Sequence, residues 1–283
     1  YTTVCAMPNT QPPLDSRAAI ESVLREAENS AVVRVLPIGT ITRGRAGKEL
    51  APAGELANAG VVALSDDGDA VADPSLMRHA LEYSTRFGLP VAQHCEDPVL
   101  IQGGQMHEGW VATRLGLRGR SASAEETFVA RDIALAELAG AHLHICHVST
   151  AGSVALIAAA RARGARVTAE VTPHHLTLTH EEVAFGEDYR TAHYITNAKV
   201  NPPLREEADL QALAVALRDG VIDCIATDHA PHSVADKEIE FDLAAPGLTM
   251  LETSFGLCMK LVHDGHLSLP TLVERLTIGP VRA

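Results

Sequence analysis

Positive charge is scarce in this sequence. Its 283 residues include 23 Lys and Arg against 36 Asp and Glu, so the formal net charge is -13 at pH 7. A nucleic-acid surface and a basic amphipathic segment at a membrane both need clustered Lys and Arg. The composition therefore argues against nucleic-acid and membrane partners, and an anionic substrate has to be held by local groups.

Cysteine pairs, a leader segment and long apolar runs are also lacking. The cysteines are odd in number and form no C-x-x-C pair, which predicts thiols that serve as small buried hydrophobes in a reducing compartment. No signal peptide and no apolar run of membrane length occurs. We therefore expect a cytoplasmic chain without disulfides. Because the sequence begins inside a strand-like run and stops without a helix end, we also expect a fragment truncated at both ends.

Strand-like and helix-like segments alternate along the chain. Near-continuous apolar runs separated by amphipathic segments are typical of parallel strands with crossover helices. Strands are predicted near Val4, Val33, Val61, Val91, Leu143, Val167 and Ile225. Helices are predicted after Asp15 or Ser16, after an N-cap at Asp73, and at residues 50–58, 124–138, 154–162, 210–217, 250–262 and 271–276. A loop is predicted between His94 and residue 124, and no element is predicted for residues 183–200.

This α/β pattern leaves an open doubly wound sheet and a closed barrel as alternatives. No G-x-G-x-x-G motif or P-loop follows any strand, which disfavours a nucleotide-binding sheet. A (β/α)₈ barrel needs eight strands, and here seven follow a start within a strand. We therefore predict a TIM-type (β/α)₈ barrel, a single domain over residues 1–283, whose first strand lies upstream of Tyr1.

Polar side chains follow these strands at the ends that meet on one face of a barrel. They are Asn9, Asp67, His94, His147, Asn201 and Asp228. Carboxylates and imidazoles without thiolates suit Zn²⁺ in a catalytic site, and two ions about 3.5–4 Å apart can activate a bridging water. We interpret Asp67, His94, His147 and Asp228 as metal ligands, and Asp228 also as the catalytic residue.

Each of these residues also has a purely structural explanation. A histidine at a strand end is usually a hydrogen-bonded core residue, and residues 66–68, Asp-Asp-Gly, are typical of a turn. Asn9 and Asn201 lie beside prolines and can be turn formers. The histidines of segments 142–144 and 174–175 are interpreted as structural. The functional interpretation depends on the joint arrangement, because four candidate ligands fall at the ends of four different strands.

Six short motifs occur in chain order. They are Met7-Pro8-Asn9-Thr10, Ser65-Asp66-Asp67-Gly68, His94-Cys95-Glu96-Asp97, His147-Val148-Ser149-Thr150, Asn201-Pro202-Pro203-Leu204-Arg205 and Asp228-His229-Ala230-Pro231-His232. Together they resemble the motif series of bacterial class I dihydroorotases in the amidohydrolase superfamily. The resemblance implies a zinc-dependent barrel that reversibly cyclises N-carbamoyl-L-aspartate to L-dihydroorotate in pyrimidine biosynthesis.

The resemblance also implies roles for individual positions. His94 and His147 match metal ligands of the fifth and sixth strands, and Asp228 matches an eighth-strand Asp that binds metal and transfers protons. Asp67 matches a fourth-strand position at which hydantoinases and many dihydroorotases carry a carboxylated Lys, whereas the class I form that this chain resembles uses an Asp. Residues 61–69 contain no Lys, which disfavours a hydantoinase. The positions that match substrate contacts are Asn9, Asn201, His232, Pro246 and Gly247.

One motif of the family is missing from this chain. His-x-His-x-Arg, which supplies two metal ligands and an Arg for a substrate carboxylate, does not occur. We expect it upstream of Tyr1, completing a site for one or two Zn²⁺ ions per subunit. The resemblance further implies a homo-oligomer and an association with aspartate transcarbamoylase.

Two other functions remain open at this point. A non-catalytic dihydroorotase-like subunit that supports a partner pyrimidine enzyme would truly lack the missing ligands. An amidohydrolase of another cyclic amide or ureide would keep the metal ligands without needing the Asn/His set. The sequence upstream of Tyr1 tests the first alternative, and a panel of cyclic substrates tests the second.

Overall fold

The computed structural model describes residues 1–185 and 193–283, and the chain packs into two compact units. The first unit comprises Tyr1–Cys95, Ala130–Cys146 and Ala160–Val167. The second comprises Glu96–Val129, His147–Ala159 and Thr168–Ala283. The prediction of a single domain over the whole chain stays a prediction.

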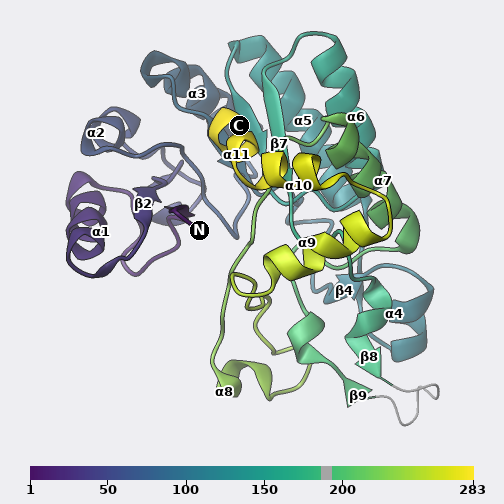
Figure 1. Cartoon of the computed structure of the whole chain (residues 1–283). Coiled ribbons are helices and arrows are strands. Elements are labelled where there is room, and N and C mark those ends of the chain that lie inside the picture. Colours follow the sequence, from purple (N-terminus) through teal and green to yellow (C-terminus); the bar gives the residue numbers. More distant parts are fainter. Residues whose placement is uncertain (186–192) are drawn as a thin grey trace. The chain divides into compact units, whose positions relative to one another are not determined.

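Short strands alternate with helices along the chain (Figure 1). The strands are β1 (Thr3–Ala6), β2 (Arg34–Pro37), β3 (Val91–Gln93), β4 (Met106–His107), β5 (Gly119–Arg120), β6 (Leu143–Ile145), β7 (Val167–Val171), β8 (Ala184–Phe185), β9 (His193–Tyr194) and β10 (Cys224–Ile225). The α-helices are α1 (Arg17–Ser30), α2 (Ala53–Ala59), α3 (Pro74–Ser84), α4 (Trp110–Leu115), α5 (Ser123–Ala139), α6 (Ala151–Ala162), α7 (Glu207–Asp219), α8 (Val234–Lys237), α9 (Ser254–His263), α10 (Leu269–Leu276) and α11 (Ile278–Arg282). Short 3₁₀ helices lie at Arg43–Arg45, Thr85–Phe87, His180–Val183 and Thr196–Ala198.

In the first unit the strands are parallel. β1 pairs with β2, β3 pairs with β6, and a single residue, Leu64, bridges in parallel to both Gly39 and Val91. Helix α1 packs against β2 and α2, as Figure 1 shows. The predicted N-caps are confirmed, because the Ser16 hydroxyl accepts from a helical N–H and the Asp73 carboxylate accepts from two.

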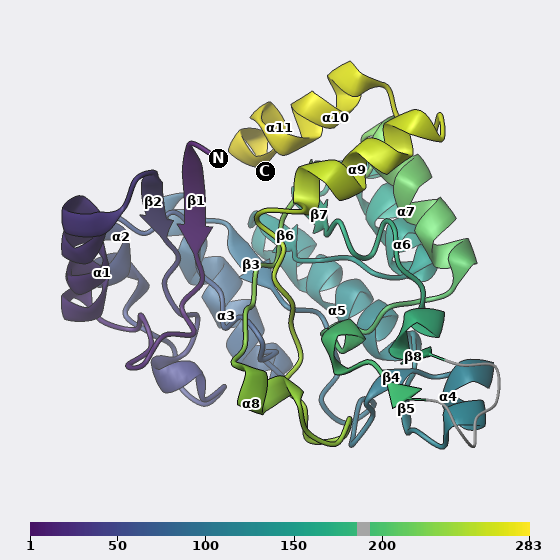
Figure 2. The same ribbon diagram turned by 60° about the horizontal axis from the view of Figure 1, so that its bottom comes forward.

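In the second unit β7 pairs in parallel with β10, with Glu170 opposite Cys224 and Val171 opposite Ile225. After β10 the chain passes through α8 and continues into α9, α10 and α11 (Figures 1 and 2). The last two helices pack against β10. A separate hydrophobic cluster lies among the shorter elements and includes Met106, Val111, Leu115, Val200, Leu204 and Phe241. The parallel pairing keeps the carboxyl ends of β7 and β10 together.

Six of the seven predicted strands are confirmed, and the one at residues 61–64 is wrong. Only Leu64 forms bridges there. The N–H groups of Val62 and Leu64 donate to the carbonyls of Pro37 and Pro90, both at 3.0 Å. Proline has no N–H to donate in return, so the ladder on each side cannot continue.

The loop predicted between His94 and residue 124 is also wrong. This segment holds β4, α4 and β5, and β4 pairs in parallel with β5. Its apolar residues are few but pack in one cluster with residues far away in the sequence, which include Val183, Ala198, Val200 and Leu204. Within the segment that had no predicted element, Gly186, Asp188 and Tyr189 lie outside the described residues.

Four cysteines are buried, as predicted, whereas Cys5 is exposed. Burial raises the pKa of the Cys258 thiol to about 12, as expected for a thiol that serves as a hydrophobe. Cys5 lies between two half-buried residues of β1, so the alternation of a strand directs it to the other face. Among the described residues no helix has both the length and the apolar character needed to cross a membrane.

Candidate functional site

In the first unit Asp67 and His94 follow two segments that pair in parallel. Leu64 and Val91 form a parallel bridge, and Asp67 and His94 follow these two residues by the same number of positions. Both side chains therefore lie at the carboxyl ends of their segments. His94 is buried, and Asp67 is half-buried. Asn9 donates from its Nδ2 to Oδ2 of Asp67 at 2.8 Å. Asn9 and Asp67 are therefore in contact, and His94 follows the neighbouring segment in the same register.

The two aspartates of the Asp66-Asp67 pair differ in their surroundings. Asp66 is buried, and its Oδ1 accepts from the N–H groups of Ile41 at 2.8 Å and Thr42 at 3.0 Å, while its Oδ2 accepts from the Thr42 hydroxyl. Burial raises the pKa of Asp66, and the hydrogen bonds from Thr42 oppose that rise. The turn explanation thus fits Asp66, and Asp67 remains the candidate ligand.

In the second unit His147 and Asp228 lie near the same strand, β7. The N–H of His147 lies 3.4 Å from Oε1 of Glu170 in β7, and the next residue, Val148, donates to the carbonyl of Glu170 at 2.9 Å. Asp228 follows β10, whose Cys224 is paired with the same glutamate. His147 is buried and Asp228 is half-buried. The structure therefore brings these two predicted ligands to the carboxyl end of one strand.

Both of these residues have a left-handed backbone, with φ of +33° at His147 and +46° at Asp228. Among the described residues only Arg45 shares a positive φ without being glycine. Such a backbone costs on the order of 1–3 kcal/mol and concentrates at active sites. Two of the three strained positions are thus predicted ligands, which favours the functional interpretation over that of a simple turn.

His175, which was interpreted as structural, has a partner at each ring nitrogen. Nδ1 lies 2.8 Å from the Thr172 hydroxyl and Nε2 lies 3.1 Å from the carbonyl of Pro202. Because a carbonyl only accepts, Nε2 carries the proton. Burial, helped by the charge of His147, lowers the pKa of His175 to about 3. The structural interpretation is confirmed for His175 and stays a prediction for His174.

The predicted substrate positions His232, Pro246 and Gly247 lie together. Nε2 of His232 is 2.8 Å from the Pro246 carbonyl, so this nitrogen carries the proton. Gly247 has φ +133°, and a Cβ there would lie 2.7 Å from the Ala230 carbonyl oxygen. Its N–H donates to the Lys199 carbonyl at 2.9 Å. Only glycine fits this position. The close approach of Gly247 to Ala230 places residues 246–247 next to the turn after Asp228.

Two buried lysines, which no sequence motif marks, hold the same segment. Lys237 donates from Nζ to the carbonyls of Ala245 at 2.7 Å and Thr196 at 3.1 Å. Lys199 donates to the carbonyls of Phe241 at 2.7 Å and Asp242 at 3.0 Å. Burial lowers the pKa of both amines. Each ammonium thus fixes backbone that leads into Pro246 and Gly247.

Asn201 and His229 have defined contacts as well. The carboxamide oxygen of Asn201 accepts from the guanidinium of Arg120, a residue with no role in the sequence-based interpretation. Nδ1 of His229 accepts from the N–H groups of Met250 at 3.0 Å and Leu251 at 3.2 Å. His229, which has no assigned role, therefore anchors the turn after Asp228 to the segment at residues 250–251.

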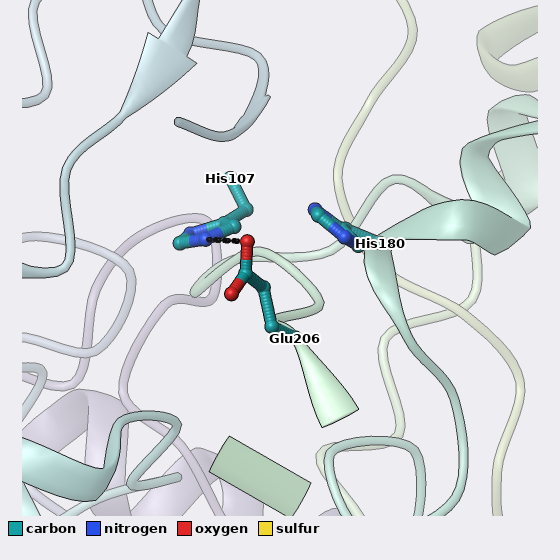
Figure 3. A group of neighbouring side chains, drawn as sticks. All are labelled: His107, His180 and Glu206. Carbon is teal, nitrogen blue, oxygen red and sulfur yellow. Dashed lines mark ion pairs between the residues drawn. The ribbon is translucent and has the colours of Figure 1, made fainter. Parts of the chain in front are cut away.

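A further group of possible metal ligands lies in the second unit and shares no residue with the predicted set. Figure 3 shows the imidazoles of His107 and His180 around the carboxylate of Glu206, with the ligand atoms within 4.8 Å of one another. Nη1 of Arg205 lies 3.2 Å from Nδ1 of His107. Because Arg only donates, Nδ1 accepts and the proton sits on Nε2, 3.7 Å from Oε1 of Glu206. With a guanidinium at Nδ1 and a proton on Nε2, His107 has no ring nitrogen left to bind a metal ion. We therefore interpret the group as a cluster of polar and charged side chains.

This cluster predicts a loss of stability in mild acid. Burial, with the charges of Arg205 and His180, lowers the pKa of His107 from 6.5 to about 4. Between these values the unfolded chain binds more protons, so the free energy of unfolding falls as the pH falls from 6.5 to about 4. Urea unfolding of His107→Gln should show a weaker pH dependence in this range than the wild type. The exposed His79→Gln is the matched control, and equal slopes for all three proteins would contradict the assignment.

The comparisons with known proteins identify the family of this chain. Residues 1–153 match the family described as dihydro-orotase-like, which is more than half of the chain. The chain belongs to the dihydroorotase-like family. This dihydroorotase-like chain is 53% identical over 283 residues to the dihydroorotase of Anaeromyxobacter sp. (strain K), and 52% identical over 283 residues to that of Pelotomaculum thermopropionicum. It is covered to 100% in both comparisons and spans 64% of the length of these curated relatives.

Solved structures resemble the dihydroorotase-like chain over nearly its whole length. The L-hydantoinase (dihydropyrimidinase) from Arthrobacter aurescens matches with a TM-score of 0.83 and 25% identity, covering 99% of this chain and 63% of its own. The dihydropyrimidinase from Brevibacillus agri NCHU1002 matches with a TM-score of 0.77 and 22% identity, covering 96% and 61%. These are TIM-barrel amidohydrolases, so the predicted α/β class and TIM-type barrel are confirmed.

Proposed function

We propose that the protein containing this chain is a metal-dependent dihydroorotase, which reversibly cyclises N-carbamoyl-L-aspartate to L-dihydroorotate in pyrimidine biosynthesis. The observation that carries the proposal is the left-handed backbone at His147 and Asp228, next to the same strand. It matches a site in which rigid strand ends hold an imidazole and a carboxylate in strained geometry. The curated relatives support the substrate, because they are named dihydroorotase.

The donor set fits a zinc-type ion. Imidazoles from His94 and His147 and carboxylates from Asp67 and Asp228 are the ligand types of catalytic zinc sites. We propose that these four residues hold one or two Zn²⁺ ions, with further ligands from a His-x-His-x-Arg motif outside this chain. Bound zinc would polarise the amide carbonyl and lower the pKa of a water towards about 7.

Asp228 is the proposed proton carrier. During ring opening its carboxylate accepts a proton from the attacking water and returns it to the departing ring nitrogen, acting first as base and then as acid. Ring closure reverses both transfers. The position of Asp228 supports this role, because the residue follows β10, is half-buried and has its backbone in the left-handed region.

The remaining positions are proposed to hold the substrate. Nδ1 of His232 is the ring nitrogen left for a substrate, since Nε2 donates to Pro246. Asn9, Asn201 and the backbone of Pro246 and Gly247 complete the proposed contact set. A homo-oligomer, an association with aspartate transcarbamoylase and a cytoplasmic location stay predictions, the first two testable by size exclusion of the protein alone and with that enzyme.

The proposed function is tested with a substrate panel. We expect the full-length protein, loaded with Zn²⁺, to open dihydroorotate and to turn over hydantoin and dihydrouracil far more slowly, because only dihydroorotate carries a ring carboxylate. Faster turnover of hydantoin or dihydrouracil would favour an amidohydrolase of another cyclic amide. No turnover of any of the three, together with no bound metal, would favour a non-catalytic subunit.

A further inference from the structure

Arg120 occupies a defined position beside a proposed substrate contact. It ends β5, and its side chain is 16% exposed. The guanidinium donates from Nε to the carbonyl of Gly104 at 2.8 Å, and from Nη1 to the carboxamide oxygen of Asn201. Nη1 also lies 3.2 Å from Oε2 of Glu96, whose side chain is buried. The group is therefore fixed by a carbonyl and a carboxylate while it contacts Asn201.

The backbone of Arg120 is fixed as well. Its carbonyl accepts from the N–H of Glu108 at 3.0 Å and from Nη1 of Arg205 at 3.3 Å. In the β4–β5 pair it lies opposite His107. With both ends held, the guanidinium loses little further freedom when it binds a carboxamide, which makes the contact with Asn201 well oriented.

This contact determines whether the oxygen or the NH₂ group of the Asn201 carboxamide is directed toward a ligand. A guanidinium has only donors, so the atom of Asn201 that faces Arg120 must be the carbonyl oxygen. The NH₂ group, which has only donors, is consequently on the other side of the carboxamide. Donors suit a carboxylate or carbonyl oxygen of a substrate, and the reversed carboxamide would present an acceptor to the same oxygen.

We propose that Arg120 is a positioning residue that acts through Asn201, fixing its carboxamide so that the NH₂ group faces an oxygen of the anionic substrate. The inference rests on the proposed function, which assigns Asn201 to the substrate. Glu96 already supplies an anionic partner to Arg120, so the proposal assigns the guanidinium to the carboxamide and not to the substrate carboxylate. This distinguishes Arg120 from an arginine that pairs with the substrate.

The test measures kcat and KM for dihydroorotate in the full-length protein. Arg120→Gln should raise KM about tenfold, the value of one oriented hydrogen bond, and change kcat little. Arg120→Lys keeps a donor and a charge beside Glu96 and should recover part of the loss. Arg118→Gln removes the same charge from an exposed side chain just before β5 and should leave both constants unchanged.

A double-mutant cycle separates positioning from general stability. In an Asn201→Ala background, Arg120→Gln should have no further effect on KM, because its route to the substrate is gone. If Arg120→Gln does not fold with Glu96 unpaired, Glu96→Gln combined with Arg120→Gln removes both charges and carries the same comparison. Additive effects on KM, or an equal fall in kcat and kcat/KM, would overturn the inference. A wild-type protein inactive on dihydroorotate would instead overturn the proposed function, and this inference with it.

Discussion

Replacing Asp228 by Asn in the full-length protein is expected to lower kcat for dihydroorotate by about 10⁴-fold, the upper end for general acid–base catalysis. The reason is that one carboxylate performs both transfers in the proposed mechanism, and a carboxamide can neither accept the proton of the attacking water nor return it. Asn suits the test better than Ala because Asp228 has φ +46°, a region that Asn tolerates. The measurements are kcat, Tm and the metal content of both proteins.

The outcome distinguishes two roles of the carboxylate. If Asp228→Asn keeps its metal and its Tm but loses turnover, proton transfer is the lost step. If metal is lost with activity, ligation is the larger contribution. Asp219→Asn, at the exposed end of α7, is the matched control and should leave kcat unchanged. Wild-type turnover in Asp228→Asn would sink the assignment.

The strands and helix starts could be predicted because their signals are local. Segments with alternating buried apolar residues, such as Val167–Val171, favour strands. The side chains of Ser16 and Asp73 bind N–H groups only a few residues away. The failure at residues 61–64 has a distant cause, since the prolines that interrupt the ladder belong to neighbouring segments. β4, α4 and β5 were missed for a similar reason, because their few apolar side chains find a core only after folding.

The candidate site likewise contains residues that the sequence reveals and residues whose role appears only in the structure. Ligand types at strand ends are visible in the sequence, so Asp67, His94, His147 and Asp228 could be selected before any geometry was known. Lys199 and Lys237 lie in polar stretches typical of a surface, and they are buried because distant carbonyls surround them. No local pattern encodes such partners.

Arg205 shows how much stability such a buried cation can contribute. Its side chain is fully buried, with Nε 2.9 Å from the Ser149 hydroxyl, Nη1 3.2 Å from Nδ1 of His107 and Nη2 3.6 Å from Oε2 of the buried Glu125. Arg205→Met keeps the length of the side chain but leaves the carboxylate of Glu125 without its cation. We expect a loss of about 3–5 kcal/mol in the free energy of unfolding. Urea unfolding at pH 7 should show a lower midpoint with an unchanged m-value.

Two further variants identify the source of that loss. Arg218→Met removes an arginine whose partner, Asp219, is as exposed as itself, and should leave the urea midpoint unchanged. Arg205→Met combined with Glu125→Gln leaves no buried charge unpaired, so it should be more stable than Arg205→Met alone. If the double variant gains nothing, the hydrogen bonds to Ser149 and His107 outweigh the ion pair. An Arg205→Met protein within about 1 kcal/mol of the wild type would contradict both explanations, because a guanidinium with these partners would then be replaceable by packing alone.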